Sequence, residues 1–453
     1  MTATAAEPLF HLPAAIPGPR DGQDESRPLK VIDLFAGAGG LSEGFRQAGF
    51  DVVAGSDVDP DAVATYKLNF PEATPLSGDI REGSVKRDVL SVGRGVDVVV
   101  GGPPCQAFSQ VRNHSRIIDD PRNSLYREFV ASVADIAPAA FVMENVPGMA
   151  QMGVLEQVVE DLSLGGTYTV EPQVLDAADF GVPQTRKRIV FLGVRTALKT
   201  APVRLTGTNA TEVLGLIRQG KGQYEVDGRG GDAEKYLERL ADPQDARIVT
   251  AAQAISDLED LEAGRRLDDI ATGELPRAKG AYQRLMRQGR GPTVRNVSVP
   301  RINRDTVTRL LAIPAGGNHR DLSEELLARY ISGDKWGPST DSGRLGRSHF
   351  YAYRRLHPAI WAWTLNTKAD SAYHYRAARA LSVREFARLQ SFPDRFVFTT
   401  DERRGNIPGR IDGGATHSRY RQVGNAVPPL LAAAIAREVA TLVRTARRRA
   451  ALG

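Results

Sequence analysis

The single cysteine of the 453-residue chain lies in a segment whose residue types predict its structural environment. Cys105 follows Gly-Gly-Pro-Pro at 101–104, directly after the apolar run 96–100, which predicts a buried strand with Asp97 as its one polar interruption. Proline lacks the N–H that a strand ladder needs, so the chain must turn there. In an open α/β sheet, a turn at the carboxyl end of a strand lies where ligands bind. A thiol on such a turn predicts a nucleophile rather than a small buried apolar residue.

Other charged and polar side chains stand next to apolar runs in the same way. One predicted buried strand ends in Glu144 and Asn145. Arg186 and Arg188 lie in Gln-Thr-Arg-Lys-Arg, immediately before another apolar run. In isolation each of these side chains is typical of an ordinary solvated surface, so their candidacy depends on the other segments of the chain.

The elements that must position these side chains alternate in type. Between residues 30 and 194, seven apolar runs of strand length alternate with helical patterns, which predicts a doubly wound, Rossmann-like α/β sheet. The first unit is a strand at 30–35, a glycine loop at 36–40 and a helix from about 41 to 48. Asp57 follows the next strand, about 20 residues downstream of the loop, where an acid can accept hydrogen bonds from ribose hydroxyls.

The glycine loop bears on the class of cofactor. Gly37, Gly39 and Gly44 put the third glycine out of register with the dinucleotide fingerprint Gly-x-Gly-x-x-Gly. NAD, and with it an oxidoreductase, is therefore disfavoured. Glycines in such a loop can instead allow a ligand to approach the backbone closely.

The segment Pro103-Pro104-Cys105-Gln106, with Phe108-Ser109, resembles the nucleophile loop of the DNA (cytosine-5) methyltransferases. Further segments are similar to that family and occur in its order: the loop 33–40, Glu144-Asn145-Val146, the run 184–188, the capped helix that begins at Ser382 with Glu385, and the stretch 421–429. The likeness extends from about residue 31 to residue 430. Asp57, where the family more often has Glu, and Val58, where an aromatic residue often packs on the adenine, depart from its pattern.

The resemblance implies a reaction and a set of roles. Cys105 attacks C6 of a flipped-out cytosine, Glu144, held protonated, donates to N3, and Arg186 holds O2, while methyl transfer to C5 uses S-adenosylmethionine. The implied cofactor-binding residues are Phe35, Gly37, Gly39, Asp57, Asp79, Pro104 and Asn425. The implied substrate-binding residues are Gln106, Ser109, Asn145 and Arg188. No metal is expected, because a single cysteine excludes multi-cysteine zinc sites and the histidines lack metal-ligand spacing.

The composition and the resemblance together predict four regions. We expect a flexible N-terminal tail at 1–28, a cofactor-binding catalytic domain at 29–199 and a smaller, irregular target-recognition region at 200–379. The capped helix and a C-terminal return to the catalytic domain are expected at 380–453. The basic end, 444–453, is expected to be solvated.

Charge and hydropathy bound the partners. A net charge of +5 permits a polyanionic partner without demanding one. No apolar run approaches the ~18 residues of a membrane span, so neither a membrane nor a secretory route is expected. The resemblance implies double-stranded DNA as partner, action as a monomer, and a cytoplasmic, nucleoid-associated location. The bacterial type of enzyme either accompanies a separate restriction endonuclease or stands alone.

Two other functions stay open at this point. A tRNA cytosine-5 methyltransferase shares the nucleophile loop, although the continuation Ala107-Phe108-Ser109 and the large recognition region favour DNA. A catalytically silent DNA-binding relative is disfavoured by the presence of Cys105, Glu144 and Arg186 together.

Overall fold

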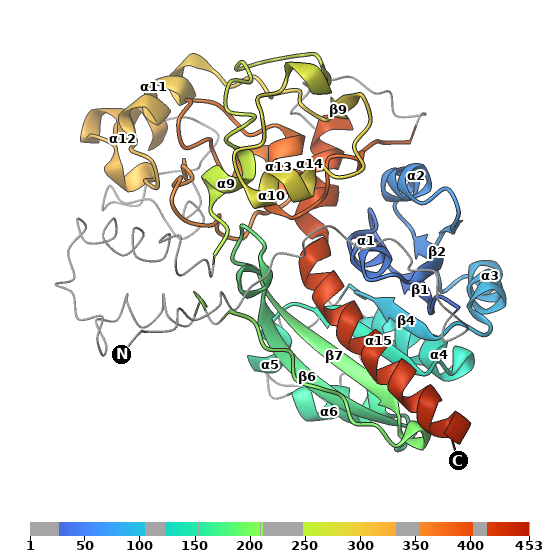
Figure 1. Cartoon of the computed structure of the whole chain (residues 1–453). Coiled ribbons are helices and arrows are strands. Elements are labelled where there is room, and N and C mark those ends of the chain that lie inside the picture. The colour runs from blue at the N-terminus through green and yellow to red at the C-terminus, as the bar shows by residue number, and fades with distance from the viewer. Residues whose placement is uncertain are drawn as a thin grey trace, which may run out of the picture. The chain divides into compact units, whose positions relative to one another are not determined.

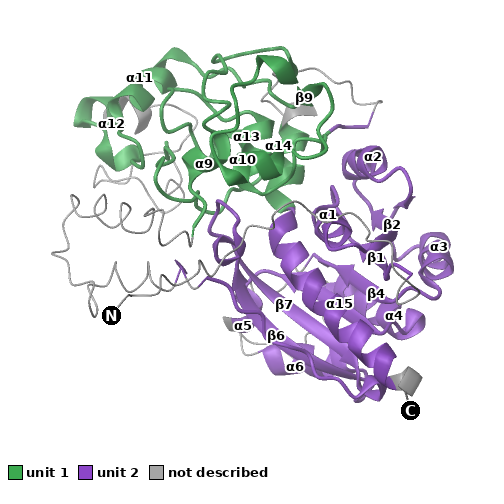
Figure 2. Ribbon diagram, viewed as in Figure 1, with its two compact units in different colours: residues 1–12, 216–398, 402–425 green, residues 13–215, 399–401, 426–453 purple. Residues whose placement is uncertain are grey.

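The structure of the chain is a computed structural model (Figure 1). It describes residues 27–104, 123–151, 154–208, 210–211, 248–331, 353–401 and 415–452. These residues divide into two compact units (Figure 2). The sheet unit contains the described residues up to 211, 399–401 and 426–452, and the second unit contains 248–398 and 415–425. The region predicted as 380–453 is thus divided between the two units.

The sheet unit alternates strands and helices over most of its length. In chain order its elements are β1 (Lys30–Leu34), α1 (Gly40–Gln47), β2 (Asp51–Asp57), α2 (Pro60–Asn69), β3 (Thr74–Ser77), α3 (Gly83–Gly93), β4 (Val98–Gly101), α4 (Ser124–Ile136), β5 (Ala140–Asn145), α5 (Gly148–Gln151), α6 (Leu155–Ser163), β6 (Tyr168–Asp176), the 3₁₀ turn η4 (Ala177–Phe180), β7 (Lys187–Arg195), η5 (Thr196–Leu198) and α15 (Pro429–Leu452).

Seven strands form one sheet in the order β3-β2-β1-β4-β5-β7-β6. Neighbouring strands are parallel except at β7, which runs antiparallel to both β5 and β6. The classic dinucleotide-binding sheet has the order 3-2-1-4-5-6, so here an antiparallel strand is inserted before the last position. The predicted doubly wound α/β sheet is confirmed, and the inserted strand distinguishes it from the dinucleotide-binding arrangement.

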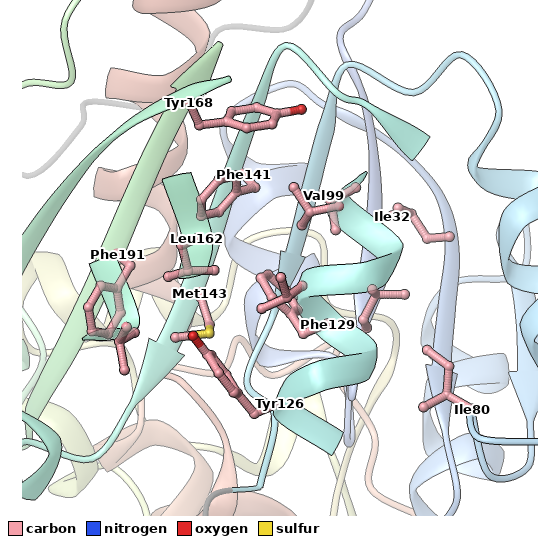
Figure 3. Packing of buried hydrophobic residues seen from close by; sticks show 14 of the residues in the cluster. Ile32, Ile80, Val99, Tyr126, Phe129, Phe141, Met143, Leu162, Tyr168 and Phe191 are labelled. Atoms are coloured by element: carbon pink, nitrogen blue, oxygen red, sulfur yellow. The ribbon is translucent and has the colours of Figure 1, made fainter. Parts of the chain in front are cut away.

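One face of this sheet carries an apolar core formed with α3, α4 and α6 (Figure 3). Alternate residues of a strand point to opposite faces. Ile32, Val99 and Phe141 point into this core, where the ring of Phe129 from α4 meets Phe141 edge to face at a centroid distance of 6.2 Å. The intervening Asp33 of β1 points to the other face, toward α1. The core therefore holds rigid the strands whose carboxyl ends carry the candidate site.

Helix α15 packs closely on α1. A side chain at Gly44 of α1 would have its Cβ 2.6 Å from both the Ala433 nitrogen and the Pro429 oxygen of α15. Gly40, at the start of α1, lies equally close to the backbone of Val427, just before α15. The C-terminal return to the first domain thus docks directly on the helix that follows the glycine loop.

The basic end of α15 is anchored to the sheet at one residue. The helix continues to Leu452, and Arg447 forms an ion pair with Asp97, beside the start of β4. Asp97 also accepts a hydrogen bond from the Lys30 nitrogen at 2.8 Å and pairs with Arg27 at 3.2 Å. The polar interruption of the β4 segment therefore ties the C-terminal helix to the edge of the sheet remote from the glycine loop, while Arg448 and Arg449 are exposed, as expected for this basic end.

One helical stretch, His417–Arg449, is long and apolar enough to cross a membrane by length and composition. The expectation that no apolar run reaches this length was therefore wrong. However, 67% of its most apolar window is buried inside the protein, as in a core helix of a soluble protein.

The second unit has short elements joined by long connections. They are α9 (Ala251–Ile255), β8 (Asp269–Ala271), η7 (Thr272–Glu274), α10 (Ala281–Met286), β9 (Thr293–Arg295), α11 (Arg304–Ala312), η8 (His319–Asp321), α12 (Glu324–Ile331), η10 (Ala369–Ser371), α13 (Val383–Leu389) and α14 (Ala415–Asn425). β8 and β9 pair antiparallel.

Helix α13 begins with the predicted capping box. The Glu385 nitrogen donates to Ser382 Oγ at 3.2 Å, and the Ser382 nitrogen donates to Glu385 Oε2 at 2.7 Å. Arg379 binds both oxygens of Glu385 at 2.8 Å, with all of these groups buried. The capping box is confirmed, and its carboxylate is also neutralised by an arginine.

Candidate active site

The glycine loop between β1 and α1 is held in a left-handed backbone conformation. Phe35 has φ +59° and Gly37 has φ +55°. The Gly37 nitrogen donates to Asp57 Oδ2 at 2.8 Å, so the acid at the end of β2 fixes the loop from below. A Cβ at Gly37 would contact nothing within 4 Å, whereas one at Gly39 would collide with the ring of Phe70. Gly37 thus leaves the loop open on one side, and Gly39 serves packing on α2.

A buried carboxyl group, Asp33, and a half-buried one, Asp57, lie beneath this loop, and no described cation pairs with either. Burial raises the pKa of Asp57, while N–H groups of Asp59 and Gly37 oppose that rise. Burial raises the pKa of Asp33 to about 7, although Asp33 Oδ2 accepts hydrogen bonds from Ser42 Oγ at 2.7 Å and from the Ser42 nitrogen at 3.1 Å. Asp33 Oδ1 is buried and has no partner among the described residues. Val58, just past β2, is an apolar side chain with 64% exposure.

Asp79, after β3, is engaged by a neighbouring arginine. Arg81 Nε lies 2.9 and 3.0 Å from the two oxygens of Asp79, and Arg81 Nη1 donates to Ser124 Oγ at 3.2 Å. These hydrogen bonds lower the pKa of Asp79. Both carboxylate oxygens of Asp79 are therefore already bound by Arg81.

The turn that leads to the cysteine begins at the carboxyl end of β4. Asn145, at the end of the adjacent β5, donates from Nδ2 to the carbonyl oxygen of Pro103 at 3.0 Å and is buried. Pro104 is exposed. The predicted residues Cys105, Gln106 and Ser109 lie outside the described residues. Asn145 therefore supports the backbone that precedes Cys105.

Glu144 lies directly beside this turn. A Cβ at Gly102 would be 2.9 Å from Glu144 Oε2. Glu144 Oε1 forms an ion pair with Arg188 Nε at 2.5 Å, and each side chain is only 13% exposed. The two residues meet because β7 runs antiparallel to β5, with Asn145 opposite Ile189.

Arg186 is deeper than Arg188, with 2% exposure. Burial lowers the pKa of Arg186 well below its usual value, the charge of Arg188 lowers it further, and Glu144 opposes both. Asp176 fixes the backbone here, because its Oδ1 accepts from the Arg186 nitrogen at 2.9 Å and its Oδ2 from Thr185 Oγ1 at 2.7 Å. Two arginines and one carboxylate thus gather beside the turn that carries the cysteine.

The sheet unit brings together most of the predicted site. The carboxyl ends of β1 and β2 place Phe35, Gly37 and Asp57 at one part of its edge, and those of β4 and β5 place Pro103 and Glu144 at another. Asn425 ends α14 in the second unit, is exposed, and stays a prediction as a cofactor residue. Among the described residues, no group of three or more His, Cys, Asp or Glu side chains is placed to hold a metal ion.

This arrangement can be compared with known proteins. The family model for C-5 cytosine-specific DNA methylases matches residues 29–441. The chain belongs to this family. The resemblance inferred from the nucleophile loop is therefore confirmed over most of the chain, and the enzyme is a DNA (cytosine-5) methyltransferase.

Similar proteins cover most of the enzyme. It is 31% identical over 435 residues to the type II methyltransferase M.XorII of Xanthomonas oryzae pv. oryzae, which covers 92% of this chain and 86% of the relative. It is 32% identical over 420 residues to M1.HphI of Haemophilus parahaemolyticus, covering 91% and 86%. A crystal structure from E. coli, described as a DNA modification methyltransferase encoded within a prophage, is 26% identical, with a TM-score of 0.54 over 91% of this chain and 99% of the other.

Sequence reasoning named these candidate residues but missed how they pair. The ion pair between Glu144 and Arg188 depends on the antiparallel direction of β7, which no local pattern gives. The bond from Asn145 to Pro103 likewise joins residues 42 positions apart.

Proposed function

We propose that this enzyme transfers a methyl group from S-adenosylmethionine to C5 of a flipped-out cytosine in duplex DNA, through a covalent adduct between Cys105 and C6. The observation that carries the proposal is the position of Glu144. Its carboxyl group lies against Gly102, three residues before the only thiol of the chain, and beside two arginines. A thiol, an acid and cations at one turn are the groups that such an adduct requires.

The residues of the glycine loop fit this cofactor. Gly37 leaves open space above a backbone fixed by Asp57, the exposed Val58 offers an apolar surface, and Asp33 has an oxygen that lacks a partner. Phe35, Gly37, Asp57 and Asp79 would hold it, together with Pro104 and Asn425. When bound, it supplies an electrophilic methyl group on a sulfonium sulfur.

The enzyme's own groups prepare the base. The thiolate of Cys105 forms a bond to C6 while N3 takes a proton from Glu144, which leaves electron density on C5 for the methyl carbon. Water then takes the C5 proton, the bond between C6 and sulfur breaks to restore the thiolate, and N3 returns its proton to Glu144. The electropositive surroundings of Arg186 and Arg188 favour a thiolate over a thiol.

The ion pair between Glu144 and Arg188 must separate before Glu144 can donate a proton to the base. Cytosine presents hydrogen-bond acceptors at N3 and O2, so a bound base needs a donor at each. We propose that the base separates the pair: Glu144 takes up a proton and donates to N3, and a guanidinium donates to O2. The neighbouring position of Arg188 makes it a candidate for this role beside the predicted Arg186.

The remaining expectations are part of the same proposal. Reaching C6 within a duplex requires extrusion of the base, at a cost of a few kcal/mol. We propose that Gln106 and Ser109 contact the DNA, that the second unit reads its sequence, and that the enzyme acts as a monomer in the cytoplasm at the nucleoid, with or without a separate restriction endonuclease.

The experiment is methyl transfer from labelled S-adenosylmethionine to duplex DNA and, in parallel, to tRNA. We expect label in DNA as 5-methylcytosine, and a covalent complex with the matching duplex that carries 5-fluorocytosine. Cys105→Ala should abolish both and still bind the cofactor. Turnover by this variant would overturn the covalent mechanism, and label in tRNA alone would favour the RNA enzyme.

A further inference from the structure

One arginine of the second unit is partly buried and has no side-chain partner among the described residues. Arg290 lies in the turn after α10, is partly buried, and its Nη1 atom is shielded from solvent. Its side chain has no hydrogen-bond or ion-pair partner among the described residues. An ordinary solvated arginine would expose this nitrogen to water, so the position calls for another explanation.

The charges that face Arg290 do not neutralise it. They are the cations of Arg287 and Arg388 and the carboxylates of Asp257 and Asp394. Arg388 binds Asp394 at 2.8 Å through two nitrogens and Asp257 at 2.5 Å, and Arg287 also binds Asp257. Two aspartates therefore already serve two arginines, and Arg290 adds a third cation.

The surplus of positive charge opposes folding. Burial lowers the pKa of Arg290, and the charge of Arg287 lowers it further. A second basic side chain, Arg395, passes over the same turn, with its Cδ 3.3 Å from the Cβ position of Gly289. A guanidinium that has a shielded nitrogen without a partner among the described residues, next to a surplus of cations, is typical of a residue kept for a ligand.

We propose that Arg290 binds a phosphate of the DNA backbone. Guanidinium groups bind phosphate through paired hydrogen bonds, and an anion at this turn would complete the charge balance that the two aspartates leave open. Such a contact positions DNA and carries no sequence information. The proposal rests on the proposed function, because it takes DNA as the polyanion.

Arg290→Ala tests this assignment, with Arg284→Ala as its matched control. Arg284 lies on α10 only six positions earlier, and its side chain is exposed. Binding of two fluorescent duplexes, one with the enzyme's target and one unrelated, is measured by anisotropy at several KCl concentrations. We expect Arg290→Ala to weaken binding to both duplexes by roughly tenfold, as for a lost charged hydrogen bond. The slope of log affinity against log salt should become less steep by about 0.9, as for one lost phosphate contact. Arg284→Ala should stay within about twofold of the wild type.

Thermal unfolding separates this function from a structural role. Because the cation opposes folding, Arg290→Ala should melt at the same temperature as the wild type or higher. Wild-type binding with an unchanged salt slope overturns the proposal, as does a loss confined to the target duplex, which indicates base reading, or a lowered melting temperature. Failure of the wild type to methylate cytosine would overturn the proposed function only. The role of Arg290 would still be tested by the binding data.

Discussion

Replacing Asp33 by asparagine should stabilise the sheet unit at alkaline pH. The carboxyl group is fully buried and no cation is among the groups that shift its pKa. Its Oδ2 accepts two hydrogen bonds from Ser42, which an asparagine oxygen can also accept, while its Oδ1 has no partner among the described residues. The substitution therefore removes a buried charge and keeps both existing hydrogen bonds.

The magnitude follows from the pKa. In the folded protein Asp33 titrates at about 7 instead of 3.8. Between these two values the folded state holds a proton that the unfolded state has lost, so stability falls as pH rises through this window. At about 1.4 kcal/mol for each pH unit, the full penalty above pH 7 is roughly 4 kcal/mol. The new amide NH₂ finds no acceptor, which costs about 1–3 kcal/mol, so the net gain at pH 8 should be about 1–3 kcal/mol.

Urea unfolding at several pH values between 5 and 9 measures this. All three tryptophans lie in the second region, at 336, 361 and 363, so far-UV circular dichroism is the probe that also follows the sheet unit. The wild type should lose stability as pH rises to 7, and Asp33→Asn should lose less. Asp51→Asn, at an exposed carboxylate on the neighbouring strand, should leave the slope unchanged. Equal slopes for Asp33→Asn and wild type would refute the reasoning.

Two further substitutions test the packing and a second buried group. Gly44→Ala should lower the free energy of unfolding in urea by about 1–3 kcal/mol, because the added Cβ would collide with the backbone of α15. Gly83→Ala is the control and should not destabilise, because only the end of the Arg87 side chain lies near its Cβ position. Equal effects of the two substitutions would contradict the close approach of α1 and α15. Burial lowers the pKa of His374 to about 4, so the unfolded state binds a proton at higher pH than the folded state, and stability falls as pH drops from 6.5 toward 4. His374→Asn should make stability less dependent on pH in this range, although it loses the ring stacked on Tyr375. An unchanged dependence would exclude His374 as its source.

Local chemistry was enough to predict the features that depend on neighbouring residues. The capping box of Ser382 and Glu385, the strand before the cysteine and the glycine loop all follow from short patterns, and all are present. The direction of β7 could not be predicted this way, because the residue pattern of a strand does not show whether it pairs parallel or antiparallel with its neighbours. That direction decides that Arg188 meets Glu144.

The roles of buried charges were also beyond sequence reasoning. Asp97 reads as an interruption of an apolar strand, and its partner Arg447 is 350 positions away. Because this pair exists only after the chain has folded back, no local pattern could predict it. The same holds for Arg388 of α13, which is fully buried and binds Asp257 and Asp394.

The pairing of Glu144 with Arg188 resolves a physical difficulty of the proposed mechanism. An acid that is to protonate N3 must be poorly hydrated, yet a partly buried carboxylate without a partner costs stability in the absence of substrate. While no base is bound, Arg188 stabilises the carboxylate of Glu144 by pairing with it. Removing one partner of such a pair is expensive, so the pair should separate only when a base offers acceptors to both groups at once. Cytosine does so through N3 and O2, and thymine, which carries a hydrogen on N3, does not. The ion pair would thus make Glu144 available as an acid only when cytosine is bound, before the thiol reacts.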